Sequence, residues 1–400
     1  MRAIQGALMM AGSFQMAVSF LGFWRNAIRL LSPLSIVPYV AFTGLGMYHL
    51  GFPMLAQCIE IGLPGLFVFI ILSLYLPRFF QRRQRVMERF SPIFSAIIVW
   101  LFAEILTLST VYNNKPLKTQ LSCRTDRAGI ITAASWVSVP YPFQWGRPTI
   151  NAGDSFAMIA ASIVSLFEST GTFYATARYG SATPVPPSVV SRGTGWHGVG
   201  VLLHGMFGGI CGCTASVENA GLLALTKVGS RRVIQIAAGF MIFFSIFGKI
   251  GALFASIPLP IIAALYCILC GYITSAGLSF LQFCNLNSFR TKIVLGFSLF
   301  IGLSIPQYMR EYFWVGSSCR SYDSKSCWFQ DILVVVFSSH ATVSVILSVL
   351  LDLTLGRDND ETKLDTAHNW WHKFTLYKSD IRNTEFYSLP WMLNKCFPSV

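Results

Sequence analysis

A glutamate and an asparagine stand between two strongly apolar stretches of this chain. They are Glu218 and Asn219, in the segment ASVENAGLLALTK of residues 215–227. An ionised carboxylate accepts hydrogen bonds from N–H groups, but it is costly to keep at membrane depth. A chain that keeps an ionisable side chain in such a setting usually uses it, so this segment predicts a functional site.

A second glutamate offers the same chemistry. Helical spacing puts Glu168 on one face with Ser165, Thr172 and Thr176, and this face is expected to be wet or buried against protein. Two carboxylates together with irregular backbone suit a planar, uncharged ligand with alternating N–H and C=O edges. At low dielectric a carboxyl group can also gain and lose a proton near neutral pH. Glu168 and Glu218 are therefore predicted to contact substrate and to couple its binding to protons.

Structural roles would explain the same two glutamates. Glu218 would then face water from a loop, and Glu168 would hydrogen bond to Ser or Thr inside a helix bundle. The sequence offers little for other chemistry, because it has no phosphate-binding loop, no G-x-S-x-G and no H-E-x-x-H. The histidines in or near the apolar spans, which are His49, His197, His204 and His340, have no second ligand at metal spacing. We expect no enzymatic activity, no metal and no cofactor, with a proton as the coupling ion.

The composition predicts that these residues lie in a membrane protein. Of the 400 residues, 54% are apolar or aromatic and only 12% are charged, and the mean hydropathy is +0.56. Runs of roughly 17 to 25 apolar residues, long enough to cross a bilayer, occur near 5–23, 34–51, 60–76, 92–112, 153–177, 198–213, 233–256, 260–282, 293–309 and 331–353. The segment between Gly212 and Lys227 is counted as an eleventh, broken crossing. The expected fold is an all-α polytopic membrane protein.

The basic residues predict an orientation. The net charge is +13, but the arginines and lysines gather in alternate loops, which favours the positive-inside rule over binding to nucleic acid. The basic loops, which include residues 78–90, are expected to face the cytoplasm and to touch anionic lipid of the bilayer. The same alternation puts the tail, residues 354–400, in the cytoplasm and the N-terminus outside. Because no cleavable signal pattern follows Met1, helices are expected to be missing upstream.

The segment of residues 215–227 has the pattern of a broken helix. ASV favours extended backbone, and NAGLLALTK favours about two helical turns with Asn219 as the N-cap. In secondary transporters the positive end of such a half-helix faces a cavity at the midplane. Elsewhere, prolines predict a loop over residues 181–196, and the pairs Gly205 with Gly209 and Gly208 with Gly212 predict close approach of another backbone.

The ten cysteines do not predict a disulfide framework, because half of them lie in or beside apolar spans. Cys319 and Cys327 share an outside loop, and a bridge between them is as expected as its absence. Cys58 and Cys123 are expected on the same side.

ENAGLLALTK resembles the signature of the nucleobase-ascorbate transporter family. That signature is Gln, Glu or Pro, then Asn, any residue, Gly, four residues, Thr, and finally Arg, Lys or Gly. Its fixed positions are matched by Glu218, Asn219, Gly221, Thr226 and Lys227. FESTGTFYATARYG resembles the family's preceding substrate-binding helix, with Glu168 at the place of its binding glutamate. The resemblance covers essentially the whole chain and is closest to plant members.

The resemblance implies fourteen transmembrane segments in two inverted repeats of seven, with core and gate domains and substrate held between two half-helices. It implies transport of purines, uracil or ascorbate with protons or sodium, by a multi-pass protein of the plasma membrane that forms a homodimer. A Glu at the first signature position is similar to uracil-type and many plant members, whereas Gln is typical of uric acid and xanthine carriers. The expected substrate-binding residues are Glu168, Glu218, Asn219 and Val217, and the expected structural residues are Gly221, Thr226 and Lys227.

Three departures from the family pattern bear on this expectation. MRAIQGAL aligns with the start of the family's fourth span, so the first three spans are expected to be absent, in agreement with the outside N-terminus. Thr172 stands where bacterial and fungal members often have Asp. Cys211 and Cys213 replace more usual small or polar residues.

The expected organisation follows the repeats. Residues 1–112 form the remainder of the first repeat, 113–152 an extracellular loop, 153–256 the core spans of the second repeat with the substrate site, 257–353 its gate spans, and 354–400 a cytoplasmic tail. The predicted function is proton-coupled transport of a small-molecule nucleobase of purine or uracil type. The alternative is a truncated, non-transporting isoform or fragment that associates with a full-length relative, and ascorbate is the alternative substrate.

Overall fold

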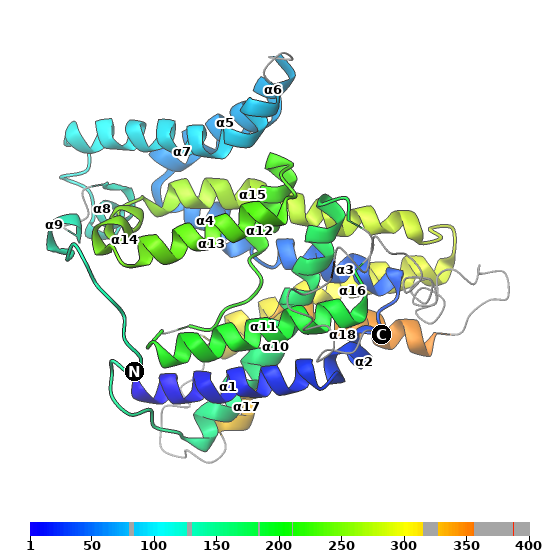
Figure 1. The fold of residues 1–400 in the computed structure, drawn as a ribbon. Coiled ribbons are helices and arrows are strands. Elements are labelled where there is room, and N and C mark those ends of the chain that lie inside the picture. The colour runs from blue at the N-terminus through cyan, green and yellow to red at the C-terminus, as the bar shows by residue number, and fades with distance from the viewer. Residues whose placement is uncertain are drawn as a thin grey trace. The chain divides into compact units, whose positions relative to one another are not determined.

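The computed structural model describes residues 1–79, 84–125, 130–182, 185–209, 211–314, 327–355 and 387. All regular secondary structure in these ranges is helical (Figure 1). Among the described residues, six helices are long and apolar enough to cross a membrane, or up to eight if each of two bent pairs is one span. This supports an all-helical polytopic membrane protein. The count of eleven crossings and the arrangement in two repeats of seven stay predictions, and nearly all of the predicted tail lies outside the described residues.

The helices group into two compact units. Unit 1 comprises Met1–Gly46, Pro142–Val217 and Ile273–Val400, and unit 2 comprises Met47–Tyr141 and Glu218–Tyr272. Unit 1 contains α1 (Arg2–Phe20), α2 (Phe23–Ile28), α3 (Pro33–Leu45), α10 (Ala152–Tyr179), α11 (Pro187–Met206), α16 (Phe289–Tyr308), α17 (Cys327–Phe337) and α18 (His340–Thr354). The predicted division at residues 112, 152, 256 and 353 concerns functional domains and stays a prediction.

Unit 2 combines the 25-residue helix α7 (Gln84–Leu108) with several shorter helices. These are α4 (Phe52–Leu55), α5 (Ile59–Ile70), α6 (Leu76–Phe79), α8 (Leu117–Cys123), α9 (Ile130–Ala133), α13 (Arg231–Ser245) and α14 (Gly248–Ala255). α12 (Val217–Thr226) and α15 (Leu259–Ser279) have residues in both units. Short 3₁₀ or π segments are η1 (Tyr48–Leu50), η2 (Ala56–Cys58), η3 (Ile71–Tyr75), η6 (Phe280–Phe283) and η7 (Met309–Trp314).

In unit 1, α1 lies alongside α11 (Figure 1) at a separation that only glycine permits. A Cβ added at Gly12 would lie 2.7 Å from the backbone nitrogen of Leu202, and one at Gly198 would lie 2.8 Å from that of Met16. Close approach was predicted at Gly205, whose Cβ would lie 3.1 Å from Cγ of Met9, and this is confirmed. The other glycines of the predicted pairs follow the end of α11.

The prediction of a loop over residues 181–196 is wrong from Pro187 onward. α11 begins at Pro187, so only the residues before it lie outside a helix. Proline is favoured at the first helical position, because the N–H that it lacks has no partner inside the helix there and its φ is already helical. The cluster of prolines therefore marks the start of α11, and the expected span of residues 198–213 begins earlier and ends at Met206.

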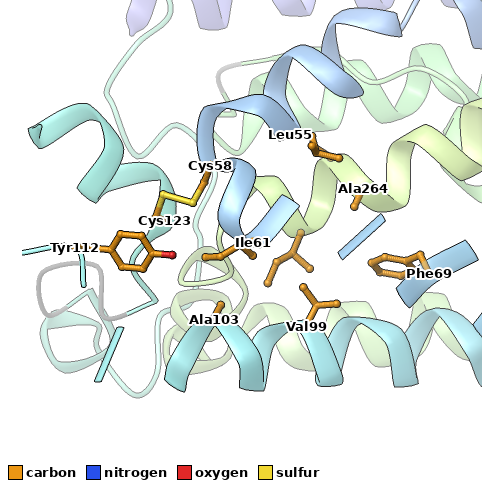
Figure 2. Packing of buried hydrophobic residues seen from close by; sticks show 11 residues of the cluster. Leu55, Cys58, Ile61, Phe69, Val99, Ala103, Tyr112, Cys123 and Ala264 are labelled. Atoms are coloured by element: carbon orange, nitrogen blue, oxygen red, sulfur yellow. A yellow bond between two sulfur atoms is a disulfide. The ribbon is translucent and has the colours of Figure 1, made fainter. Parts of the chain in front are cut away.

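In unit 2, a disulfide joins Cys58 to Cys123 and closes a buried cluster (Figure 2). The cluster combines Ile61 of α5, Val99 of α7 and Ala264 of α15, all nearly fully buried. The expectation that Cys58 and Cys123 share one side is consistent with this bond. The pairing of Cys319 with Cys327 lies outside the described residues.

Candidate functional site

The carboxylate of Glu168 lies at the start of a second helix. Glu168 belongs to α10, and its Oε1 accepts a hydrogen bond of 3.0 Å from Oγ of Ser339. Ser339 is the N-cap of α18, and its Oγ also accepts from N of Thr342 at 3.5 Å. α17 and α18 are bent by 82° at this point. The N-terminal end of a helix favours negative charge, so the bend and the cap bring a helix end of favourable polarity to the Glu168 carboxylate.

The predicted polar face of α10 is partly tied to its own backbone. Oγ1 of Thr172 donates to O of Glu168 at 3.0 Å, and Oγ1 of Thr176 donates to O of Thr172 at 2.8 Å. Thr172 is buried, whereas Glu168 and Thr176 are half-buried. The expectation that this face is buried against protein is confirmed at Thr172, and the Glu168 side chain is the member of the face that bonds to another helix.

The segment before α12 is fastened to α10 on both sides of Glu168. Ser165 donates from Oγ to O of Cys213 at 3.4 Å, and Oγ of Ser169 accepts from N of Ala215 at 3.1 Å. Residues 212–216 have no helical hydrogen bonds, so the predicted non-helical piece before a short helix is confirmed. An irregular backbone segment therefore runs beside the glutamate of α10.

The predicted N-cap at Asn219 is wrong. α12 begins at Val217, two residues earlier, so Asn219 lies in the first turn and is exposed. Val217 is buried, and burial of its side chain outweighs the preference of a β-branched residue for extended backbone. Both Glu218 and Asn219 are thus first-turn residues, where a helix favours an acidic side chain.

Glu218 is held within unit 2 by contacts to α15. The Tyr266 hydroxyl and the Cys270 thiol, one turn apart on α15, both interact electrostatically with the Glu218 carboxylate. A Cβ added at Gly221 would lie 2.7 Å from O of Leu269 and 2.9 Å from its Cα. The signature glycine therefore lets α12 approach the backbone of α15.

The last two signature residues end α12. Oγ1 of Thr226 donates to O of Leu222 at 2.8 Å, and N of Lys227 donates to O of Leu223 at 2.9 Å. Lys227 has a φ of 55°, in the left-handed region that usually follows a helix and favours glycine. This conformation gives a physical reason for a signature that accepts Gly as well as Lys or Arg at this position.

Sequence reasoning missed Ser169, Ser339 and Tyr266. A serine directly before an apolar run is a helix-start signal, so Ser339 was open to prediction as an N-cap. The contact between Ser339 and Glu168 was not, because 171 residues separate them. Within the described ranges, no three His, Cys, Asp or Glu side chains gather in a group suited to a metal ion.

Each glutamate lies near the beginning of a helix: Glu168 beside the N-cap of α18, and Glu218 in the first turn of α12. The first N–H groups of a helix have no partner within it, so each place combines a carboxylate acceptor with nearby N–H donors. That combination matches both edges of a ring that carries N–H and C=O groups. The two glutamates belong to different units, and their joint contact with one ligand stays a prediction.

Comparison with known proteins finds relatives over the whole chain. The model of the Permease family matches residues 1–311. Plant relatives that bear the name nucleobase-ascorbate transporter are 52% to 61% identical to this chain. Transporter 8 of Arabidopsis thaliana is 58% identical over 405 residues, 100% of this chain and 74% of that relative. Nucleobase-ascorbate transporter 7 of the same species is 56% identical over 400 residues, which cover 100% of this chain and 74% of that relative. Nucleobase-ascorbate transporter LPE1 of Zea mays is 52% identical over 403 residues, which cover 100% of this chain and 76% of that relative.

Proposed function

The chain belongs to the nucleobase-ascorbate transporter family, and from that membership we propose that it carries nucleobases across a membrane in symport with protons. The observation that carries the proposal is the hydrogen bond of 3.0 Å that Glu168 accepts from Ser339 at the start of α18. This hydrogen bond supports the proposal because it orients the carboxylate of a long apolar helix toward the start of another helix.

Substrate recognition follows from the hydrogen-bonding groups. In the proposed mechanism, Glu168 and Glu218 accept from N–H groups of a purine or uracil ring, while first-turn N–H groups of α12 bind its carbonyl oxygens. Val217 and Asn219 adjoin Glu218 and complete the proposed contact. Gly221 allows α12 to lie close to α15. Thr226 and Lys227 form the C-terminal end of α12 and keep this helix short.

Proton coupling follows from the same carboxylates. In symport, one of the two glutamates takes up the proton while the other stays ionised and accepts from the ring, so proton and substrate are carried together. Transport then requires the core domain to rock against the gate domain, as the family resemblance implies. We place the protein in the plasma membrane, with residues 354–400 in the cytoplasm, and treat a homodimer as a further expectation.

Ascorbate is the second candidate substrate, because the relatives' names include it. Ascorbate is an anion at neutral pH, and two carboxylates repel an anionic ligand. We therefore expect uracil or xanthine to be preferred.

The test is uptake of labelled uracil, xanthine and ascorbate by a transporter-deficient host that expresses the full chain. Uptake of a nucleobase is expected to rise in acidic medium and to fall when a protonophore collapses the proton gradient, with no requirement for sodium. Lack of uptake by protein that has reached the cell surface would contradict the proposal. Altered uptake by a co-expressed full-length relative, without uptake by this chain, would favour the non-transporting alternative.

Substitutions test the assigned residues. Glu168→Gln and Glu218→Gln are expected to lower uptake at least about tenfold, because each removes a charged acceptor worth about 1.5–3 kcal/mol. Glu60→Gln is the matched control, since its carboxylate is half exposed and pairs with Lys115. If either glutamate variant keeps the substrate preference and pH dependence of the wild type, that glutamate has no role in binding or coupling.

Ser339 offers a finer test at the same place. Ser339→Ala leaves Glu168 in position but removes the donor to its carboxylate, so we expect a higher KM for the nucleobase with little change in protein level. Ser338→Ala is the control, because Oγ of Ser338 bonds at 3.0 Å to O of Val335 and not to Glu168. Equal effects of the two substitutions would remove Ser339 from the site.

A further inference from the structure

A small recess lies where the end of α1 meets the first turns of α2 and α11, all within unit 1. Its volume of about 50 Å³ would hold about three to five water molecules at roughly 10–15 Å³ each, or one phosphate group. The polar residues that line it are Ser19, Arg25, Ser188, Ser191 and Arg192. We call this recess the Arg25 pocket. It shares no residue with the surroundings of Glu168 or Glu218.

Arg25 brings an unsatisfied donor to this pocket. Its Nε is buried, and no group in the described part of the chain accepts a hydrogen bond from it. The guanidinium lies over Gly22, where an added Cβ would stand 3.7 Å from Nη2. Gly22 has a φ of 86°, so its left-handed backbone allows the chain to turn beneath the guanidinium. A buried charged donor without an acceptor costs free energy, and a bound ligand that supplies an acceptor would remove this cost.

Two backbone carbonyls at the end of α1, near the pocket, already accept hydrogen bonds from other groups. The carbonyl of Ser19 accepts from Oγ of Ser191 at 2.6 Å and from N of Gly22 at 3.3 Å. The carbonyl of Ala17 accepts from N of Leu21 at 3.0 Å. The described residues that line the pocket include no Asp or Glu. Two arginines therefore line a recess whose own lining contains no carboxylate.

The start of α11 adds to the positive character of the pocket. Ser188 and Ser191 both lie in the first turns of this 20-residue helix, and both are buried. The N-terminal end of a helix carries unpaired N–H groups and a partial positive charge, which favour an oxyanion. Arginine matches the oxygens of a phosphate with two parallel hydrogen bonds.

The rim of the pocket is apolar. Leu21 and Phe23, on either side of Gly22, expose 73% and 65% of their surface. Arg25 and Arg192 belong to the basic loops that are predicted to face the cytoplasm, where the membrane leaflet is the anionic one. An oxyanion site next to exposed apolar side chains suits a molecule that carries both a phosphate and acyl chains.

We propose that the Arg25 pocket binds the phosphate group of an anionic phospholipid. The guanidinium of Arg25 donates to the phosphate oxygens, Ser188 and the first turn of α11 bind on the other side, and the acyl chains cover Leu21 and Phe23. The bound lipid joins the ends of α1, α2 and α11.

The test measures lipid retained by the purified full chain. The chain is purified in neutral detergent and mixed with phosphatidylserine or phosphatidylcholine, with or without inorganic phosphate as competitor. Native mass spectrometry then measures the mass of the protein with its bound lipid. The wild type is expected to retain phosphatidylserine at a concentration at which phosphatidylcholine is not retained, and excess inorganic phosphate is expected not to displace it. Arg25→Gln is expected to weaken this retention at least about tenfold.

Arg29→Gln is the matched control, because Arg29 follows α2 on the same loop, is exposed and does not line the pocket. It is expected to retain the lipid. Should Arg25→Gln prevent folding, Ser188→Leu fills the recess from α11 without removing an arginine and is expected to abolish retention as well. Equal losses in Arg25→Gln and Arg29→Gln would show unspecific attraction. Displacement of the lipid by excess inorganic phosphate would show a free-anion site. Full retention by Ser188→Leu would show binding elsewhere. Each of these three results overturns the proposal.

Discussion

Unit 1 positions Glu168 with a hydrogen bond from another helix, whereas unit 2 contains Glu218 in the first turn of its own helix. The two units are also stabilised differently. Unit 1 relies on glycine-mediated helix contacts, buried hydroxyls and one buried ion pair, and unit 2 relies on a disulfide and an apolar cluster. Both units thus have a carboxylate near the start of a helix. A tertiary contact produces this arrangement at Glu168, whereas the local sequence produces it at Glu218.

The strongest test of unit 1 is its buried ion pair. Nη2 of Arg290 lies 2.5 Å from Oδ1 of Asp352, and the same nitrogen donates to O of Asp352 at 2.6 Å, at the end of α18. Asp352→Ala removes the carboxylate that balances a buried guanidinium charge and is expected to destabilise the protein by about 3–5 kcal/mol. Thermal unfolding in detergent measures this, with Lys292→Ala, an exposed cation nearby, as the control. Equal stability of the two variants would contradict the assigned role.

The disulfide is the corresponding test of unit 2. Cys58 and Cys123 are 65 residues apart, and the entropy of closing a loop of that length corresponds to about 4 kcal/mol. The double substitution Cys58→Ser with Cys123→Ser, or reduction by a thiol, is expected to lower the unfolding temperature and to increase hydrogen exchange in α5 and α8. Cys211→Ser serves as the control, since this cysteine is not in a disulfide. Unchanged exchange in α5 and α8 would mean that the bond does not stabilise unit 2.

Gly221 tests how closely Glu218 depends on α15. Gly221→Ala places a methyl group 2.7 Å from O of Leu269, so one of the two helices must move, at an expected cost of about 1–3 kcal/mol. Gly271→Ala, on α15 itself, meets no atom within 4 Å and is expected to be neutral or to stabilise by up to about 1 kcal/mol. Unfolding temperatures of the two variants separate these outcomes. A neutral Gly221→Ala would show that α12 and α15 do not pack as described.

Lys227 gives the smallest expected effect. Its φ of 55° is unfavourable for a residue with a Cβ, so Lys227→Gly is expected to stabilise the protein by about 0.5 kcal/mol. Lys227→Ala removes the same charge and keeps the strained backbone, so it shows how much of any change comes from charge. A gain with alanine equal to that with glycine would exclude backbone strain as the cause.

The sequence predicted the elements more reliably than their ends. The apolar runs identified the long helices, and the short polar segment before α12 was recognised as a break. The first residue of α12 was misplaced because burial of Val217 decided it, and the start of α11 was misplaced because proline both breaks a helix and begins one. Local preference alone cannot resolve such choices.

The sequence by itself determined that the chain is an apolar helical protein with glutamates at Glu168 and Glu218 and a family signature around the second of them. These follow from composition and from residues near one another in the chain, where helical spacing fixes the geometry. Only the tertiary structure decided that Ser339 caps α18 and donates to Glu168, that Gly221 meets Leu269, and that Cys58 pairs with Cys123. Those contacts join residues far apart in sequence, so they depend on how the helices pack and leave no periodic pattern in the sequence.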